Sequence, residues 1–367
     1  MKPYQTPELS FLDVLAARER LRGGIPMTPC TESPGLSRLT GSRIFCKHEY
    51  LQSTGSFKER GARNALSLLP SPKARRGVVA ASAGNHALGL AWHGRALGIP
   101  VTVVMPRSAA RVKIDQCRSL GAEVILAAET FDQARSRAMQ LAWERGVPNV
   151  HPFDDPAVIA GQGTVVLEVI EQVRECDAVV VPVGGGGLLA GVAMTLRALR
   201  PEVAVIGVEP NHAPCFSTAL ACGQPTFVPT CRTLADGLAV AQAGSRAFQI
   251  AAPLVDRLVT VTESALAAAI RCIGETEGAV VEGAGAAPLA AILSGQLPEF
   301  HGKKLVLLLT GRNIDPAVHR AALAESRIWP SGRSQSSAWA GESVRGARAA
   351  VAGRAAEPEV GAGGVSG

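Results

Sequence analysis

The sequence contains no pair of cysteines separated by two residues, although it has eight cysteines in 367 residues. Without such a pair, the spacing indicates neither a structural zinc site nor a thioredoxin-like redox motif. Wide spacing in a chain of this length predicts reduced thiols and a cytoplasmic protein. The cysteines are Cys30, Cys46, Cys117, Cys176, Cys215, Cys222, Cys231 and Cys272.

Signals for export and for membrane insertion are also missing. The N-terminus, MKPYQTPELS, has no apolar core of the kind that a signal peptide needs. No uncharged apolar run is long enough to cross a bilayer as a helix. We therefore expect no membrane partner.

A basic run interleaved with aromatic residues is absent as well. The formal net charge is +6, from 37 Lys and Arg against 31 Asp and Glu, and aromatic residues make up only 4% of the chain. Binding to single-stranded nucleic acid combines a positive groove with stacking aromatic side chains. Because the charges are scattered, we expect a solvated basic surface and no nucleic-acid partner.

What the sequence does contain is a repeated strand–helix pattern between residues 77 and 309. Short runs rich in β-branched residues alternate with stretches of helical periodicity, such as 107–120 and 131–145. Near-continuous apolar strands between amphipathic helices predict an α/β fold with open, twisted and mostly parallel sheets. The expected strands are 78–82, 101–105, 123–127, 178–183, 203–208, 258–261 and 304–309.

Length and composition indicate how the chain is divided. A chain of 367 residues suits two domains better than one. After Trp329 and Pro330 the residues are mainly Gly, Ala, Ser and Arg, with almost no large aliphatic side chains. Such a composition cannot bury a core, so residues 331–367 are expected to form a disordered tail.

Open α/β sheets bind ligands beyond the carboxyl ends of their strands, so the loops after strands are where chemistry is expected. The first candidate is LQSTGSFKERGA (51–62), in which Lys58 opens a helix expected to run to Leu69. A lysine near a helix N-terminus and under an aromatic ring is expected to have its ammonium form disfavoured. The resulting free amine can form an imine with an aldehyde cofactor.

The second candidate loop is ASAGNHALG (81–89), directly after an expected strand. Its small residues leave backbone N–H groups free at the start of the next helix, an arrangement suited to a substrate carboxylate. Asn85 could add a side-chain hydrogen bond, whereas His86 is expected to be structural. An ordinary strand-to-helix turn is the competing interpretation.

The third loop, PVGGGGLLAG (182–191), contains four consecutive glycines before an apolar helix, and the fourth, LLLTGRN (307–313), places Thr310 after a strand. Glycines allow a phosphate to approach the backbone closely. The pattern is neither G-x-x-x-x-G-K-S/T nor G-x-G-x-x-G, so a nucleotide loop is not indicated. An amine, two anion sites and a hydroxyl together predict a site for pyridoxal phosphate (PLP).

At this point the chain resembles a known family, the fold-type II PLP enzymes (tryptophan synthase β-like), and within it the threonine/serine dehydratase (ammonia-lyase) and serine racemase group. The resemblance covers roughly residues 5–325. It implies a larger PLP-binding domain from residues 1–60 and 152–330, and a smaller substrate-side domain from 61–151. The motifs that carry it, in family order, are TGSFKERGA, SAGNHALG, GQGT (161–164), PVGGGGL, GVEP (207–210), TLADGLAV (233–240), VVEGAGAAPLAA (280–291) and TGRN.

The resemblance also implies roles for individual residues. Lys58 binds the cofactor covalently and then moves a proton at the substrate Cα, while Phe57 packs beside it. Asn85 hydrogen-bonds the 3-oxygen of PLP, and the hydroxyl of Thr310 faces the pyridine nitrogen. The phosphate is held by Gly184, Gly185, Gly186, Gly187 and Leu188. The substrate carboxylate is bound by Ser82, Ala83, Gly84, Asn85 and His86.

Some positions depart from the pattern of the group. Arg312 replaces a usual glycine beside the cofactor loop, which bears on the size and polarity of the substrate. Glu209 and Ala213 match the divalent-cation site of serine racemase, but Cys215 replaces its aspartate. Because Mg²⁺ and Ca²⁺ prefer oxygen ligands, that metal site is expected to be incomplete.

The implied function is conversion of a 3-hydroxy amino acid, L-threonine or L-serine, to a 2-oxo acid and ammonia by a homodimer or homotetramer. 3-Hydroxyaspartate and phenylserine remain alternative substrates. A β-replacement synthase normally carries Thr-Ser-Gly-Asn-Thr where this chain has Ser-Ala-Gly-Asn-His. A serine racemase needs a second base at the position of Ala83, and a non-enzymatic PLP-binding regulator could have lost Lys58, which is present here.

Overall fold

The computed structural model describes residues 9–109 and 111–324. The tail expected at 331–367 lies outside the described residues. In the described part of the chain the strands are β1 (Cys30–Glu32), β2 (Arg43–Lys47), β3 (Val78–Ala81), β4 (Val101–Pro106), β5 (Glu123–Ala128), β6 (Ala178–Pro182), β7 (Ala204–Pro210), β8 (Arg257–Val261) and β9 (Lys304–Leu308).

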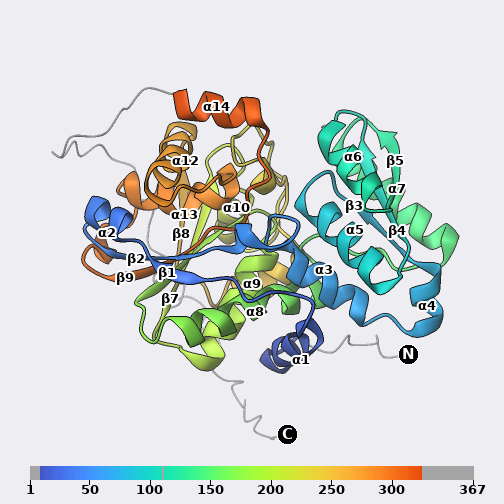
Figure 1. The fold of residues 1–367 in the computed structure, drawn as a ribbon, viewed down its shortest axis with the longest axis horizontal. Coiled ribbons are helices and arrows are strands. Elements are labelled where there is room, and N and C mark those ends of the chain that lie inside the picture. Colours follow the sequence, from blue (N-terminus) through green and yellow to red (C-terminus); the bar gives the residue numbers. More distant parts are fainter. Residues whose placement is uncertain (1–8, 110, 325–367) are drawn as a thin grey trace, which may run out of the picture. The chain divides into compact units, whose positions relative to one another are not determined.

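These strands form two sheets (Figure 1). The larger sheet has the order β1-β2-β9-β6-β7-β8, and the smaller has the order β3-β4-β5. All neighbouring strands are parallel except β1, which pairs with β2 in the antiparallel sense. The expected α/β class with two open, mostly parallel sheets is confirmed.

All seven expected strands are present, with ends that differ from the expected ones by at most two residues. The strands that the sequence did not predict are β1 and β2, which lie before the region of regular alternation. Strand β2 is an interior strand because it pairs with β1 on one side and with β9 on the other, with Arg43 opposite Lys304.

Helices surround the sheets, and the expected helices 107–120 and 131–145 correspond to α6 and α7. The α-helices are α1 (Phe11–Leu21), α2 (Pro34–Thr40), α3 (Lys58–Ser67), α4 (Ser71–Arg76), α5 (Asn85–Leu97), α6 (Arg111–Ser119), α7 (Phe131–Arg145), α8 (Pro156–Gln172), α9 (Gly187–Leu199), α10 (Cys215–Cys222), α11 (Ser245–Ala251), α12 (Glu263–Glu277), α13 (Gly283–Leu293) and α14 (Pro316–Ala324). Short 3-10 helices are η1 (Glu49–Leu51), η2 (Asp236–Leu238) and η3 (Pro298–Phe300).

The larger sheet is covered on both faces, and strand β6 shows why its sequence is apolar throughout. Successive side chains of a strand point to opposite faces. Val180 packs into a core with residues of α12 and α13, whereas Val179 and Val181 pack into a second core with residues of α8 and α9. Both sets are buried, so every residue of the strand must be apolar.

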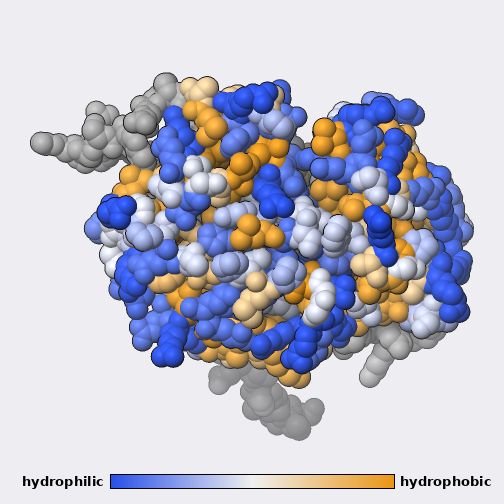
Figure 2. Space-filling view, in the orientation of Figure 1, coloured by the Kyte–Doolittle hydropathy of each residue, from blue (hydrophilic) through white to orange (hydrophobic). Residues whose placement is uncertain are grey.

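The smaller sheet is built in the same way. Val103 packs with residues of α5 and α6, and the neighbouring Val104 packs with residues of α7 on the other face. The helices turn their polar sides outward, and hydrophilic residues are spread over the face of the molecule drawn in Figure 2, with small hydrophobic areas between them.

Candidate active site

Lys58 is the first residue of α3, and the residues just before it contact the segment that follows β9. An isolated bridge pairs Ser56 with Gly311, and the backbone N–H of Phe57 donates to the carbonyl oxygen of Thr310 at 3.0 Å. These contacts join the first and fourth candidate loops. The amine Nζ of Lys58 donates to the carbonyl oxygen of Pro152 at 2.8 Å.

Burial lowers the pKa of Lys58 from 10.5 to about 8, and the carboxyl of Glu282 opposes that shift. The sequence argument expected the aromatic neighbour to disfavour the ammonium form of Lys58, and this expectation was wrong in sign. Nζ lies 5.2 Å from the centre of the Phe57 ring, and such a contact stabilises the ammonium form. The amine is therefore made available by desolvation, with the ring acting in the opposite direction.

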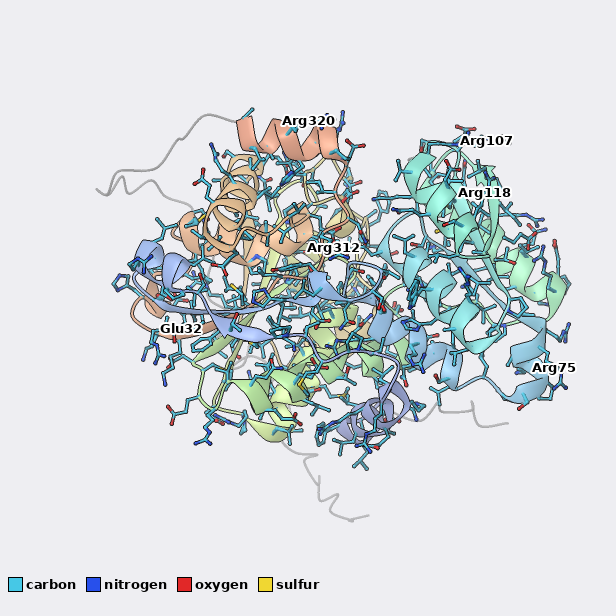
Figure 3. All side chains as sticks on the ribbon, viewed as in Figure 1. Glu32, Arg75, Arg107, Arg118, Arg312 and Arg320 are labelled. Carbon is cyan, nitrogen blue, oxygen red and sulfur yellow. The ribbon has the colours of Figure 1, made fainter. Side chains whose placement is uncertain are left out.

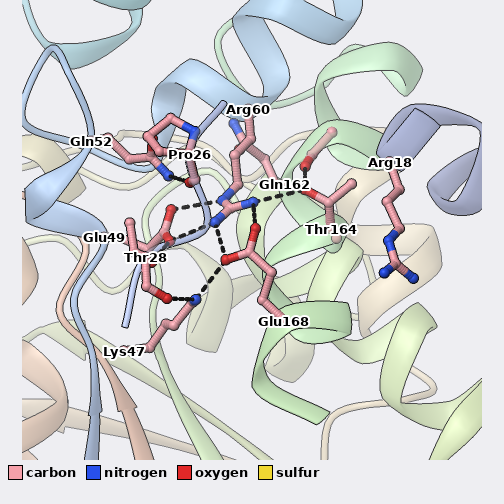
Figure 4. Close-up of polar contacts among 12 residues, drawn as sticks. Arg18, Pro26, Thr28, Lys47, Glu49, Gln52, Arg60, Gln162, Thr164 and Glu168 are labelled. Atoms are coloured by element: carbon pink, nitrogen blue, oxygen red, sulfur yellow. Dashed lines mark hydrogen bonds and ion pairs between the residues drawn. The ribbon is translucent and has the colours of Figure 1, made fainter. Parts of the chain in front are cut away.

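A buried ionic network anchors the first turn of α3 (Figure 4). The guanidinium of Arg60 makes two hydrogen bonds to the carboxylate of Glu49 and two to that of Glu168, at 2.6 to 2.8 Å. Burial alone would raise the pKa of Glu49, but Arg60 outweighs burial and holds that pKa below its ordinary value. Since Arg60 lies two residues after Lys58, the network fixes the backbone that carries the amine.

A second cation extends this network away from the helix. The buried Nζ of Lys47 donates to Glu168 at 2.6 Å and to the carbonyl oxygen of Thr28. Glu168 is thus shared between Lys47 and Arg60. Two cations facing two carboxylates leave the network without excess charge, which makes its burial tolerable.

The second candidate loop forms the N-terminus of α5. The hydroxyl of Ser82 accepts hydrogen bonds from the N–H groups of Gly84 and Ala87, both at 3.3 Å. Ala83 and Asn85 are only partly buried, and a Cβ placed on Gly84 would have no atom within 4 Å. The start of this helix therefore has free space beside N–H groups that lack intrahelical acceptors, as an anion site requires.

His86 is structural, as expected from the sequence. Its ring nitrogen Nε2 lies 3.2 Å from the carbonyl oxygen of Val150, to which it donates. Burial lowers the pKa of His86 to about 3, so the imidazole is neutral near pH 7.

The glycine loop runs from the end of β6 into α9, and each of its glycines lies against another segment. A Cβ on Gly184 would lie 3.1 Å from the Cα of Leu238, and one on Gly185 would lie 2.3 Å from the ring of Phe153. Gly186 has φ +91° and Gly187 packs on the backbone of Phe153. Only glycine fits these positions without displacement.

The glycine loop is also held by neighbouring groups. The carbonyl oxygen of Gly185 accepts the N–H of Gly244 at 3.0 Å, and Leu188 is buried in the core below. Because α9 starts at Gly187, its first N–H groups lie in this loop. A backbone without side chains at a helix N-terminus fits a phosphate group.

Thr310 lies directly after β9 and is buried. A Cβ on Gly285, in the first turn of α13, would lie 3.4 Å from the backbone nitrogen of Thr310. The backbone of Thr310 therefore lies between the carboxyl end of β9 and the start of α13. This is the carboxyl edge of the larger sheet, where ligands of such folds bind.

The structure adds residues that the sequence argument did not use, above all Glu282 and Asn313. Asn313 Nδ2 donates to Asn85 Oδ1, and Asn85 Nδ2 donates to Glu282 Oε1, both at 2.8 Å. Burial raises the pKa of Glu282 to about 8. The signal that could have found it is an acidic residue inside the otherwise apolar VVEGAGAAPLAA segment.

Pro152 and Phe153 were also missed, although they connect two of the candidate loops. The carbonyl of Pro152 accepts the amine of Lys58, and the next residue lies against Gly185 and Gly187. The four loops therefore converge, as expected: contacts through Thr310, Asn313 and Pro152 join the lysine, α5, glycine and β9 loops.

Arg312 is exposed, and its side chain lies against Gly55 in the loop before α3. A Cβ on Gly55 would lie 3.1 Å from Cγ of Arg312. In the view of Figure 3, Arg312 lies near the centre of the picture, whereas Arg75, Arg107 and Arg118 lie toward its right-hand side.

The residues of the possible metal site are engaged elsewhere. The buried carboxylate of Glu209 accepts the N–H groups of Phe216 and Ser217 at 2.7 and 2.9 Å, and so caps α10. Ala213 is buried, and the thiol of Cys215 donates to the carbonyl oxygen of Gly184 at 3.4 Å. Among the described residues, no group of three or more His, Cys, Asp or Glu side chains could hold a metal ion.

Comparison with known proteins agrees with this geometry. The sequence matches the family described as pyridoxal-phosphate dependent enzyme over residues 21–311. An L-threonine ammonia-lyase of Thermotoga maritima is 44% identical over 307 residues, which are 84% of this chain and 76% of that protein.

Two solved structures carry the same fold. The processed form of threonine deaminase isoform 2 from Solanum lycopersicum has a TM-score of 0.80 at 35% identity, covering 86% of this chain and 87% of that one. Serine racemase from Dictyostelium discoideum has a TM-score of 0.78 at 35% identity, covering 84% and 99%.

Helices long and apolar enough to cross a membrane are not found in residues 9–109 and 111–324. The cofactor predicted from the four loops is the one that names the matching family, and the fold of the two solved structures is the one expected. The chain belongs to the pyridoxal-phosphate dependent enzymes, within the fold-type II group that includes threonine ammonia-lyases and serine racemases.

Proposed function

We propose that the protein is a PLP-dependent ammonia-lyase that converts L-threonine or L-serine to a 2-oxo acid and ammonia. The observation that supports it best is the amine of Lys58, desolvated at the start of α3 and bound to Pro152 next to the glycine loop. The similarity to the L-threonine ammonia-lyase of Thermotoga maritima supports the choice of reaction and substrate.

The residues fit the cofactor. The N–H groups of residues 184–188 would hold the phosphate, Asn85 the ring oxygen, Thr310 the ring nitrogen and Lys58 the aldehyde carbon. Bound PLP supplies an aldehyde and an electron-withdrawing ring that stabilises negative charge at the substrate Cα. A Cβ at Gly185 or Gly187 would collide with Phe153, so a side chain at either position would displace the backbone N–H groups of the loop.

The amine of Lys58 would have two positions, one at the aldehyde carbon of the bound cofactor and one beside the substrate Cα. It takes the proton from the substrate Cα, and it can do so near neutral pH because its pKa is about 8. The network around Arg60 keeps the start of α3 in place while the amine moves between these positions.

The N-terminus of α5 orients the substrate. Its free N–H groups and the open space beside Gly84 suit the substrate carboxylate. Holding that carboxylate fixes which bond of Cα faces Lys58, since the amine and the carboxylate are then both anchored.

Elimination is favoured over racemisation by the residue at position 83. Racemisation requires a proton donor on the face of Cα opposite Lys58. The resemblance to serine racemase assigns that place to Ala83, and a methyl group has no proton to give. Loss of the β-hydroxyl therefore competes without a second base.

The test is 2-oxo acid release by purified enzyme from L-threonine, L-serine, 3-hydroxyaspartate and phenylserine, with Lys58→Ala as the control. We expect the highest turnover with threonine or serine and a loss of several orders of magnitude in the variant. Chiral chromatography of the same mixtures checks the reaction type: substantial D-serine would make the protein a racemase. Turnover by Lys58→Ala at the wild-type rate would contradict the assignment of Lys58 as the nucleophile.

We also propose the domain division expected from the sequence, with residues 61–151 as the smaller domain. It is supported by the smaller sheet, whose strands all come from that range. Limited proteolysis followed by mass spectrometry would locate the domain boundaries. Cleavage within β3–β5 that occurs earlier than cleavage near residues 60 and 151 would contradict the division.

A cytoplasmic homodimer or homotetramer remains part of the proposal. All eight cysteines are unpaired, which suits a reducing compartment. Light scattering coupled to size exclusion measures the assembly, and a monomer at micromolar concentration would contradict it.

A further inference from the structure

Glu282 is a buried acid for which the proposed reaction has no assigned use. It stands directly before α13, and only 3% of its surface is exposed. Its backbone N–H donates to the carbonyl oxygen of Gly311 at 2.9 Å. A Cβ on Gly311 would lie 2.3 Å from Oε1 of Glu282, so the carboxyl is packed directly against that backbone.

The hydrogen bonds around Asn85 fix which side of its amide carries the nitrogen. The carbonyl oxygen of Thr54 can only accept, so the Asn313 atom that faces it at 2.8 Å is the amide nitrogen. The second hydrogen of that nitrogen is then donated to Asn85 Oδ1. Asn85 must therefore turn its own nitrogen toward Glu282.

This arrangement leaves one hydrogen of Asn85 unassigned. An amide nitrogen has two hydrogens, and Asn85 gives one of them to Oε1 of Glu282. The other is available to a group bound in the site. A series of hydrogen bonds, from Thr54 through Asn313 and Asn85 to Glu282, thus determines the position and the direction of that remaining N–H donor.

The charges around Glu282 determine the state of its carboxyl. In the part of the chain that the structure describes, it forms no ion pair. The charged groups that act on it are Asp236 in η2, Lys113 in α6 and Lys58 in α3. Burial raises the pKa of Glu282 from 4.5 to about 8, and Asp236 adds to the rise. Lys113, the hydrogen bond from Asn85 and Lys58 oppose it.

We propose that Glu282 is a positioning residue for Asn85: the carboxyl of Glu282 accepts one amide hydrogen of Asn85 and thereby directs the other to the ring oxygen of the cofactor. This inference rests on the proposed function, because it assumes that Asn85 holds the ring oxygen of PLP. A carboxylate at Glu282 would place a second negative charge across one amide from that oxygen. Ionisation of Glu282 should therefore weaken cofactor binding.

The experiment measures the dissociation constant of PLP from wild type, Glu282→Gln and Glu282→Ala between pH 6.5 and 9.5, by equilibrium dialysis and absorption spectra. Gln keeps an oxygen for Asn85 but cannot ionise. Because Lys58 titrates in the same range, the readout is the ratio of the wild-type constant to the Gln constant at each pH. We expect a ratio within about threefold of one below pH 7 and about tenfold higher at pH 9.5.

Glu282→Ala tests the positioning itself. Loss of the acceptor should raise the dissociation constant at pH 7 by about 5- to 10-fold, the scale of one hydrogen bond. Combined with Asn85→Ala, the same change should add less than about twofold, since the amide to be positioned is gone. Fully additive effects would overturn the inference, as would a wild-type to Gln ratio that stays constant with pH.

Asp236 and Lys113 supply a matched pair of controls outside the site, joined to each other at 3.2 Å. Asp236→Asn should move the midpoint of the ratio to lower pH, and Lys113→Met should move it to higher pH. Unchanged midpoints in both would show that another group titrates and would overturn the inference. Wild-type PLP binding and 2-oxo acid release test the proposed function separately, so its failure is distinguishable from that of Glu282.

Discussion

The amine of Lys58 should be reactive near neutral pH, and the cofactor-free protein allows this to be measured directly. Burial lowers the pKa of this group from 10.5 to about 8. At pH 7 an amine with the lower pKa is neutral in about one molecule in ten, against about one in three thousand for an ordinary lysine. Raising the pH from 7 to 9 should then increase its reactivity about tenfold, followed by a plateau.

The assay is modification of the apoenzyme by 1-fluoro-2,4-dinitrobenzene, with the Lys58 peptide quantified by mass spectrometry. Nα-acetyl-lysine in the same buffers is the reference, and its rate should rise about 100-fold over that range and continue to rise above pH 9. A Lys58 profile that follows the reference would refute the argument that desolvation prepares the amine.

The remaining predictions concern the loops and their support. Gly185→Ala should weaken PLP binding by about 5- to 150-fold, because overpacking of this size costs about 1–3 kcal/mol. Gly184→Ala, with a looser contact, should have the smaller effect, and equal dissociation constants of the two variants would contradict this. Arg60→Met should lower the free energy of unfolding by about 3–5 kcal/mol, since it leaves the buried carboxylate of Glu49 without a cation and Glu168 with Lys47 as its remaining ion-pair partner. The matched change Arg18→Met, in the half-exposed pair with Glu171, should cost less than about 1 kcal/mol, and denaturant titrations of both variants compare them. Ala83→Ser should raise the ratio of D-amino acid to 2-oxo acid formed from L-serine, measured by chiral chromatography, and an unchanged ratio would remove the role assigned to position 83.

The sequence predicted the strands well where the information is local. A run such as AVVVP is apolar at every position because both faces are covered, and this property is visible in five consecutive letters. Strand β1, by contrast, is only Cys30–Glu32 and becomes a strand because β2 lies beside it. No periodicity can be read from three residues.

The site was predictable to the same extent and for the same reason. Lys58 and the four glycines stand in short segments with unusual composition, so their chemistry could be inferred without a structure. Glu282 could not be placed in that way, because its burial and its pKa depend on residues from distant parts of the chain, such as Asn85 and Gly311. The sign of the Phe57 contact likewise depends on where Nζ lies relative to the ring.

The position of β9 has a consequence for folding during synthesis of the protein. This strand lies in the middle of the larger sheet, between β2 and β6, yet it is the last strand of the sheet to be synthesised. A nascent chain on the ribosome therefore carries β2 and Lys58 for some 250 residues before their partner emerges. The complete site for the cofactor forms only after β9 has been synthesised, and until then β2 and β6 each present an unpaired edge that the cell must keep from aggregating.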